Sequence, residues 1–343
     1  MTLDLGNITV VGTGAIGGTV AVFLAEVGEK VAIVDRSVPH TEAIRSNGLL
    51  VDGIYDEHRV TFDKVLFPEE LKEPLDFVIL AAKSQHTEDA LSTIKPLLSE
   101  KGFVVSLQNG LNERRIAEVV GGHRTIGGMV DLVGNHLGPG HVRRHNKGVF
   151  YVGELDGRPT ERIQEVAKRL SRAVPTDATT NIWGYIWAKL AHTCVNVGTA
   201  LVDAPSSETY KPEWARRVFL AIMGEVAEVA QAEGIRIEEY DGFDPKVSLV
   251  RKREDLPQAL EMVPKGSSKG NSGIWLDIKV RKRKTEIEHL NGEVVRLGRK
   301  HGLPMTLNSL LYTMVREIEE GRRSMSWDNL RFLEKYANER LPK

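Results

Sequence analysis

The chain has 343 residues, of which 41% are hydrophobic, enough for about two domains with cores of their own. Its 46 Lys and Arg residues against 47 Asp and Glu leave a formal charge of −1, which argues against non-specific binding to nucleic acid. The single cysteine, Cys194, excludes an internal disulfide and a cysteine-based zinc cluster, and no run approaches the roughly 18 apolar residues of a membrane span.

The first half of the chain alternates strand and helix signals. Short apolar runs predict strands at Ile8–Val11, Lys30–Asp35, Phe77–Ala82 and Phe103–Leu107. Near-continuous apolar runs are typical of parallel strands that are covered on both faces. The alternation therefore predicts an α/β fold with a Rossmann-type, doubly wound sheet. Farther along, residues 141–153 predict a β-ribbon.

The character of the sequence changes near Asn181, after Pro175 and a threonine-rich stretch. Helical periodicity then dominates and predicts helices over about 182–201, 212–234, 272–302, 306–320 and 326–339. Residues 241–271 combine Gly, Pro, Ser and mixed charges, which indicates a partly irregular excursion. We therefore expect a dinucleotide-binding Rossmann domain over 1–180 and an all-helical substrate domain over 181–343.

A glycine-rich loop, Gly12-Thr13-Gly14-Ala15-Ile16-Gly17, follows the first predicted strand and opens a helix. Gly12 permits a tight turn, Gly14 lets the backbone approach a pyrophosphate, and Gly17 allows close helix–strand packing. The helix that begins at Ala15 and Ile16 offers free N–H groups to the phosphates. The loop predicts a dinucleotide cofactor, although a purely structural turn would use the same glycines.

Two adjacent residues at the end of the second strand bear on the choice of dinucleotide. The carboxylate of Asp35 would accept hydrogen bonds from ribose hydroxyls and repel a 2′-phosphate, which favours NAD. Arg36 could instead pair with that phosphate, or be a solvated surface charge. We expect NAD(P)H with NADH slightly favoured over NADPH, and no metal, because no cluster of Cys, His and carboxylates has ligand spacing.

Polar side chains follow two further predicted strands. Lys83 comes directly after Phe77–Ala82, and Asn109 follows Phe103–Leu107. Ligands of open α/β sheets bind at such strand ends. Lys83 could neutralise a phosphate or a carboxylate, and Asn109 could hydrogen-bond the nicotinamide ribose or a substrate oxygen. An ordinary Asn-Gly turn would explain Asn109 equally well.

A polar stripe lies on an otherwise apolar predicted helix. Lys189, His192, Thr193 and Asn196 fall within an arc of about 100°, and Lys189 is the only charged residue of the segment 178–202. The pattern favours a helix that lines a small polar cavity, where a lysine can donate a proton. A narrow solvated stripe is the alternative interpretation.

In their order and spacing these residues resemble the ketopantoate reductase (2-dehydropantoate 2-reductase) family, over nearly the whole chain. The marks are the glycine loop, Lys83, Gln108-Asn109-Gly110, Trp187-Ala188-Lys189-Leu190, Ser272, Asp277-Ile278, Thr285-Glu286-Ile287 and Asn291-Gly292. The resemblance implies a Rossmann domain followed by a helical domain, with the site in the cleft between them. It also implies that Lys189 is the catalytic lysine, that Lys83 and Asn109 contact cofactor and substrate, and that Glu286 orients Lys189 or the substrate hydroxyl.

The chain departs from the family pattern at the substrate end of the expected site. The family usually has asparagines four and eight residues after the catalytic lysine, where this chain has Thr193 and Val197, with Asn196 one place early. The usual serine of the family falls on Gly273, next to Ser272. We expect Thr193, Asn196 and Ser272 to bind substrate, and we expect 2-oxo acid chemistry more firmly than ketopantoate itself.

These observations predict an NAD(P)-dependent oxidoreductase that reduces a small 2-oxo acid to the 2-hydroxy acid. Two alternatives remain: a related dehydrogenase that acts on another hydroxy or imino acid, and a dinucleotide-binding sensor without turnover. The expected partners are a small-molecule substrate and a second copy in a homodimer, without nucleic acid or membrane. The N-terminus lacks the pattern of a signal peptide, which predicts a cytoplasmic protein. The basic run 279–284 is more typical of a solvated helix face than of an anion-attracting surface.

Overall fold

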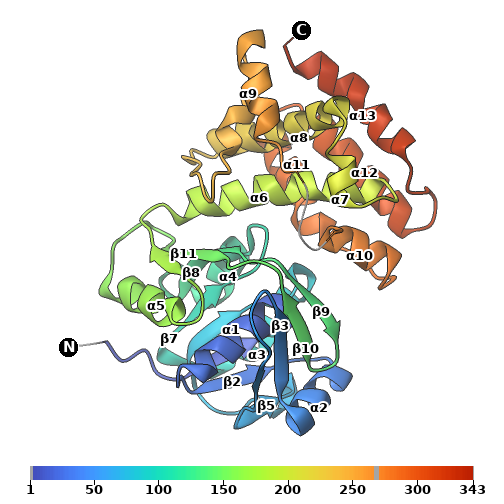
Figure 1. Cartoon of the computed structure of the whole chain (residues 1–343). Helices are drawn as coiled ribbons and strands as arrows, with labels where there is room; N and C mark the ends of the chain where they lie inside the picture. Colours follow the sequence, from blue (N-terminus) through green and yellow to red (C-terminus); the bar gives the residue numbers. More distant parts are fainter. Residues whose placement is uncertain (1–2, 266–269, 343) are drawn as a thin grey trace. The chain divides into compact units, whose positions relative to one another are not determined.

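The computed structural model describes residues 3–265 and 270–342 and divides the chain into two compact units, Met1–Ile182 and Trp183–Lys343 (Figure 1). Among these described residues, the first unit contains the sheets and five α-helices, and the second is helical apart from an isolated bridge between Tyr240 and Phe243. The predicted fold class, a Rossmann-type sheet followed by a helical part, is confirmed. No helix in the described ranges is long and apolar enough to cross a membrane.

An eight-stranded sheet forms the centre of the first unit, in the order β12-β11-β8-β7-β6-β1-β2-β5. All neighbouring pairs are parallel except β8 and β11. The strands are β1 (Ile8–Val11), β2 (Val31–Val34), β5 (Lys64–Leu66), β6 (Leu75–Leu80), β7 (Leu98–Ser106), β8 (Thr125–Asp131), β11 (Val149–Glu154) and β12 (Thr176–Ala178). All four residues of β1 are buried, which explains its continuous apolar sequence.

Helices cover both faces of this sheet, and the alternation along β6 shows which residues face each side. Phe77 and Ile79 belong to one hydrophobic cluster, and Val78 and Leu80 belong to another. The helices of the unit are α1 (Ala15–Glu26), α2 (Val38–Asn47), α3 (Thr87–Ile94), α4 (Asn112–Val120) and α5 (Glu161–Ser171). Side chains of α1 and α5 pack in the first cluster, and those of α3 and α4 pack in the second.

The predicted β-ribbon over 141–153 is wrong, because its two strands belong to different sheets. A second sheet has the order β4-β3-β10-β9, with β3 (Leu49–Gly53), β4 (His58–Val60), β9 (Gly134–Gly138) and β10 (His141–Arg144). β10 pairs with β3 and β9, whereas β11 pairs with β8 and β12. The buried guanidinium of Arg144 donates to the carbonyls of Asn146 and Lys147, which folds the connection tightly as the chain changes sheets.

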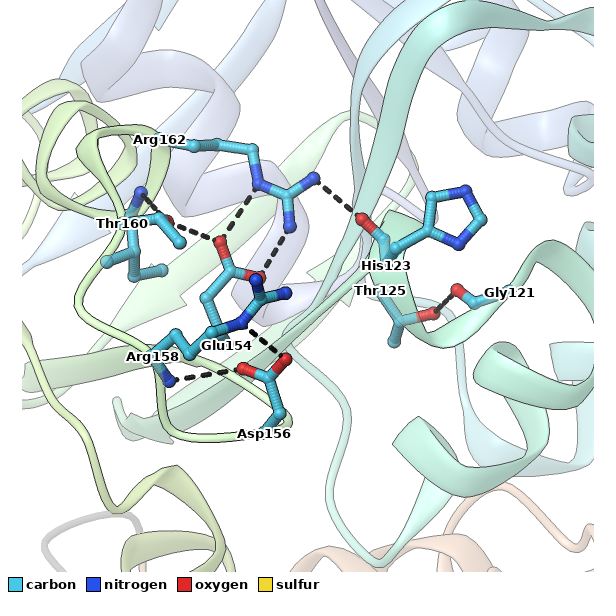
Figure 2. Close-up of polar contacts among 9 residues, drawn as sticks. Gly121, His123, Thr125, Glu154, Asp156, Arg158, Thr160 and Arg162 are labelled. Atoms are coloured by element: carbon cyan, nitrogen blue, oxygen red, sulfur yellow. Dashed lines mark hydrogen bonds and ion pairs between the residues drawn. The ribbon is translucent and has the colours of Figure 1, made fainter.

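A cluster of polar contacts fastens α5 to the end of β11 (Figure 2). The buried carboxylate of Glu154 accepts hydrogen bonds from Thr160 Oγ1, at 2.6 Å, and from Arg162 Nε, at 3.0 Å. Arg162 also donates to the carbonyl oxygen of His123, just before β8, at 2.8 Å. Thr160 caps α5 by accepting from the N–H of Ile163. These partners satisfy a carboxylate that would be costly to bury alone.

The second unit is built from helices that match four of the five sequence predictions closely. They are α6 (Ile182–Gly198), α7 (Ser206–Thr209), α8 (Glu213–Ala232), α9 (Leu256–Glu261), α10 (Gly273–Lys279), α11 (Asn291–Lys300), α12 (Thr306–Glu319) and α13 (Trp327–Arg340). The predicted long helix over 272–302 is wrong, because α10 ends at Lys279 and α11 begins at Asn291. Within the described part of the predicted excursion 241–271, short 3-10 helices and α9 interrupt an otherwise irregular backbone, and residues 266–269 lie outside the described residues.

The break after α10 has a physical cause in the side chain of Asp277, which is fully buried. Its Oδ1 atom accepts hydrogen bonds from Arg281 at 2.7 Å and from Arg283 at 3.1 Å, and the N–H of Arg283 donates to its carbonyl oxygen. The chain turns back around this carboxylate, with Lys282 at a φ of 51°. A continuous helix would instead have kept like charges adjacent along the basic run.

A chain of buried polar groups joins four helices of the second unit. Glu225 of α8 accepts from the backbone N–H groups of Leu307 and Asn308 at the start of α12. The side-chain oxygen of Asn308 accepts from Asn291 at 2.8 Å, and Asn291 also donates to the carbonyl oxygen of Cys194 in α6. The network fixes the beginning of α11 against α6, the helix that carries the polar stripe.

Candidate active site

The carboxyl ends of four central strands lie level at one edge of the sheet. The register pairs Val11 with Val34 and with Leu80, and it pairs Leu80 with Ser106. Consequently the four turns after β1, β2, β6 and β7 leave the sheet on the same side. These turns carry the glycine loop, Asp35, Lys83 and Asn109, so the structure brings the predicted residues of the first unit to one edge.

The glycines of the loop after β1 differ in what surrounds them. A Cβ atom on Gly12, whose φ is 90°, would lie 2.6 Å from the backbone N of Ala82, and one on Gly17 would lie 2.0 Å from the carbonyl oxygen of Gly12. A Cβ on Gly14 would meet no atom within 4 Å. No side chain caps the N-terminus of α1 at Gly14. Close packing thus explains Gly12 and Gly17, and Gly14 leaves open space where a pyrophosphate could approach the helix N-terminus.

Asp35 holds the glycine loop as well as marking the end of β2. Its Oδ2 atom accepts from the N–H of Thr13 at 2.7 Å and from the Thr13 hydroxyl at 2.9 Å, and its Oδ1 accepts from the N–H of Ser37. On the other side of the loop, buried His40 accepts the N–H of Gly140 at Nδ1, so its Nε2–H donates to the carbonyl oxygen of Thr13. Sequence reasoning missed His40, because only the fold brings Gly140 to it.

Arg36 lies on the surface beside α3. Its guanidinium bonds to Nδ1 of His86 at 3.0 Å and pairs with Asp89 at 3.3 Å, with 60% of the side chain exposed. An exposed pair of this kind is weak and leaves the guanidinium able to change partner. Both interpretations of Arg36 fit this arrangement: it is a surface charge, or its guanidinium pairs with a 2′-phosphate when one is bound.

Buried amides tie the turn after β6 to the turn after β7. Gln108 donates to the carbonyl oxygen of Ala82 at 2.7 Å, and Asn112 donates to the Ser84 hydroxyl at 3.0 Å and to the carbonyl oxygen of Asn109 at 2.7 Å. The Ser84 hydroxyl donates to that same carbonyl. Since Lys83 precedes the first turn and Asn109 lies exposed in the second, the network fixes the backbone of both predicted contact residues.

Glu113, in the first turn of α4, is a fully buried carboxyl group behind the same turn. Among the described residues, neither of its carboxyl oxygens has a hydrogen-bond partner. Burial raises the pKa of Glu113 to about 7, and a weaker interaction with Ser106 opposes the shift. Sequence reasoning missed Glu113, because an acidic residue in the first turn of a helix is usually exposed and stabilises the helix N-terminus.

The polar stripe of α6 is only half-buried, as are Trp183 and Tyr185 near the start of that helix. Lys189, His192, Thr193 and Asn196 are intermediate in exposure, and the helix positions between them are buried. The Thr193 hydroxyl donates to the carbonyl oxygen of Lys189 at 2.8 Å. Asn196 Oδ1 accepts from the hydroxyl of buried Tyr210 at 2.8 Å, and burial raises the pKa of that phenol. The stripe is thus a row of polar groups in an apolar setting.

Aromatic side chains from the segment after α8 border the stripe. The phenol oxygen of Tyr240 lies 2.8 Å from Nδ1 of His192, and the ring of Phe243 lies 4.8 Å from the imidazole. The Nζ atom of Lys189 lies 5.6 Å from the centre of the Tyr240 ring. Neither aromatic residue belongs to a motif in the sequence, and only their contacts reveal them.

The remaining predicted residues lie at starts of helical turns in the second unit. Ser272 caps α10, because its hydroxyl accepts from the N–H of Trp275 at 3.2 Å, a structural role that spacing did not reveal. Glu286, which is 6% exposed, precedes the 3-10 turn Ile287–His289 that leads to Asn291. No group of three or more His, Cys, Asp and Glu within 3–265 and 270–342 could hold a metal ion.

Comparison with protein families matches both parts of the chain. The family model described as ketopantoate reductase PanE/ApbA matches residues 8–157, and the model of its C-terminal domain matches residues 181–319. A curated protein from Pyrococcus horikoshii, 2-dehydropantoate 2-reductase, is 30% identical over 316 residues, which is 91% of this chain and 97% of its own.

Solved structures share the fold over the same length. A PanE/ApbA family ketopantoate reductase from Ralstonia eutropha JMP134 aligns with a TM-score of 0.78 and 27% identity, over 93% of this chain and 100% of its own. A D-mandelate dehydrogenase, solved with NADH and anilino(oxo)acetate, aligns with a TM-score of 0.81 over 92% of this chain and 99% of its own. At 23% identity, the second likeness concerns the fold alone.

Proposed function

The chain belongs to the ketopantoate reductase family, and from this premise we propose that it reduces a small 2-oxo acid to the 2-hydroxy acid with Lys189 as proton donor. It is an oxidoreductase that acts on CH–OH groups with a nicotinamide cofactor. The observation that carries the proposed mechanism is the setting of Lys189, the one charged side chain of α6, among short polar groups on a helix whose other positions over 186–198 are buried.

The residues of the first unit fit a dinucleotide. The open space at Gly14, with Ala15 and Ile16 at the N-terminus of α1, would receive the pyrophosphate, and the tight packing of Gly12 and Gly17 supports that geometry. Asp35 would face the adenosine ribose, and Lys83 and Asn109 would contact the cofactor near the substrate. When bound, the cofactor supplies a hydride to the carbonyl carbon of the substrate.

Lys189 would manage the charge that develops on the substrate. As the carbonyl carbon gains a hydride, negative charge grows on its oxygen, and the ammonium group stabilises that oxygen and gives it a proton. The oxygen becomes the hydroxyl of the product, and Lys189 is left neutral until solvent returns the proton. Glu286 would orient Lys189 or the hydroxyl, and Thr193, Asn196 and Ser272 would bind the rest of the substrate.

A steady-state assay tests the proposed function. The purified chain is mixed with NADH or NADPH and a panel of 2-oxo acids with side chains of different size, ketopantoate among them, and cofactor oxidation is followed. Turnover of at least one 2-oxo acid is expected. Turnover confined to oxidation of other hydroxy or imino acids would support the related dehydrogenase, and cofactor binding without any turnover would support the sensor. The names of the curated relatives favour neither alternative.

For the cofactor we propose that NADH serves at least as well as NADPH. The Asp35 carboxylate stays fixed by Thr13 and Ser37 beside the loop, where it would repel a 2′-phosphate. The ratio of kcat/KM for the two cofactors measures this directly. A preference for NADPH by more than about tenfold, or about 1.4 kcal/mol, would contradict it and make Arg36 the residue that recognises the phosphate. We also keep the homodimer as an expectation, which light scattering of the purified chain tests.

A further inference from the structure

A tight hairpin presents Tyr240 to the stripe of α6. The backbone N–H of Tyr240 donates to the carbonyl oxygen of Phe243 at 3.2 Å, and that of Phe243 donates back at 2.8 Å. The two residues between them, Asp241 and Gly242, have φ values of 45° and 72°. Positive φ at both central positions is the geometry of a type I′ turn, for which Asp-Gly is a favoured sequence. The position of Tyr240 is therefore defined by local chemistry.

The hairpin is also anchored after the turn. Asp244 Oδ1 accepts from the N–H of Lys246 at 3.0 Å and starts a 3-10 turn that ends at Ser248. The Lys246 ammonium donates to the carbonyl oxygen of Ile237, on the other side of the hairpin. A Cβ on Gly224 of α8 would come within 3.0 Å of the Ser248 carbonyl oxygen, so the segment packs tightly on that helix. Such a segment can hold a side chain in place.

Tyr240 uses two different parts of its side chain on the stripe. Its hydroxyl is hydrogen-bonded to His192, and its ring lies within the distance at which an ammonium group is attracted to an aromatic face, 5.6 Å from Nζ of Lys189. Tyr240 is 3% exposed and Lys189 is half-buried, so the contact is partly shielded from water. The hydroxyl contact fixes the ring, and the ring faces the cation.

We propose that Tyr240 is a positioning residue of the reductase, which holds the ammonium of Lys189 through its ring face while its hydroxyl is anchored on His192. The inference rests on the proposed function, in which Lys189 donates the proton. A lysine side chain has four rotatable bonds and loses much freedom when it is fixed, so a ring that holds the ammonium lowers the cost of reaching the reactive position.

Three substitutions separate the ring from the hydroxyl and from the hairpin. Tyr240→Phe keeps the ring and removes the hydroxyl, Tyr240→Leu removes both, and Phe243→Leu removes the other aromatic ring of the same turn. With the best 2-oxo acid of the panel, we expect Tyr240→Leu to lower kcat about tenfold, with the KM of the cofactor unchanged. Phe243→Leu should keep kcat within about threefold, and Tyr240→Phe, which keeps the ring but loses its anchor on His192, should lose less than Tyr240→Leu. If Tyr240→Leu does not fold, Tyr240→Met fills the space flexibly and takes its place.

Four results would overturn the assignment. Retention of kcat by Tyr240→Leu would show that the ring does not act, and an equal loss in Phe243→Leu would show that the hairpin is only structural. An equal loss in Tyr240→Phe would transfer the effect from the ring to the hydroxyl. In a Lys189→Ala background, Tyr240→Leu should cause no further loss, because Tyr240 acts through Lys189, and an undiminished loss there also contradicts the proposal. If Lys189→Ala itself keeps its kcat, the proposed function has failed first.

Discussion

Single residues of the glycine loop have separable roles, and Gly14 offers the clearest test. Because a Cβ on Gly14 meets open space, Gly14→Val should fold, yet its side chain would occupy the position of the pyrophosphate. We expect NADH binding, measured by calorimetry, to weaken by more than about tenfold, or about 1.4 kcal/mol. Gly122→Val, at another open position outside the loop, is the matched control and should bind normally. Normal binding by Gly14→Val would make the loop purely structural.

The buried carboxyl of Glu113 predicts a dependence of stability on pH. Its pKa is raised from 4.5 to about 7 in the folded chain, so between these values the folded state binds more protons than the unfolded state. The contribution to stability is therefore full below about pH 4.5 and is lost as the pH rises to about 7. Glu113→Gln carries no charge to bury, so urea unfolding should show its free energy of unfolding rising relative to that of the parent chain by about 1 kcal/mol per pH unit across this window. A difference that does not change with pH would refute this.

The residues that the sequence could not reveal are those whose partners come from afar. Asp35 was predicted to contact the cofactor from its separation in sequence from the glycine loop, but the hydrogen bond that it accepts from Thr13 depends on the register of β1 and β2. His40 and Tyr240 lie outside any motif and form hydrogen bonds with Gly140 and His192, respectively, 100 and 48 residues away. The expected role of Lys189 came from the polar stripe, that of Asn109 from its place after a strand and that of Glu286 from the resemblance, and all three stay predictions.

At the level of elements, hydrophobic periodicity predicted most helices of the second unit correctly. It was wrong over 272–302, where the buried carboxylate of Asp277 ends the helix. The pattern over 272–302 continues through the basic run, yet Asp277 draws Arg281 and Arg283 out of helical geometry. The predicted β-ribbon over 141–153 was also wrong, because its two strands pair with partners in different sheets. The alternation of polar and apolar residues does not show which strands pair. Local patterns do not encode such long-range choices.

The ion pairs after α10 predict which carboxylate contributes most to the stability of the fold. Asp277→Ala leaves the two arginines without their buried partner and should lower the free energy of unfolding by about 3 kcal/mol. Asp203→Ala removes the exposed pair with Lys279, at 2.7 Å, from the same run and should cost less than about 1 kcal/mol. Urea titration of both variants measures the difference. Equal losses would mean that the buried carboxylate does not organise the break.

For the whole molecule, the alternation of strands and helices followed by helices alone was sufficient to predict the fold class. The near-continuous apolar strands, such as β1, could be recognised because both faces of the sheet are covered. The division into Met1–Ile182 and Trp183–Lys343 falls close to the composition change at Asn181. The contacts of Tyr240, after α8, were not predictable, since they depend on a turn that presents this aromatic residue to α6.

The central claim is that Lys189 donates the proton, and the kcat of Lys189→Ala with the best 2-oxo acid tests it most directly. We expect a fall of roughly 10²–10⁴, the range usual for general acid catalysis, with the affinity for the cofactor nearly unchanged because the glycine loop is intact. Lys279→Ala, which removes a lysine on the surface of the same unit, should leave kcat as it was. A folded Lys189→Ala variant that keeps more than about a tenth of kcat would contradict the account and make His192 the first residue to examine instead.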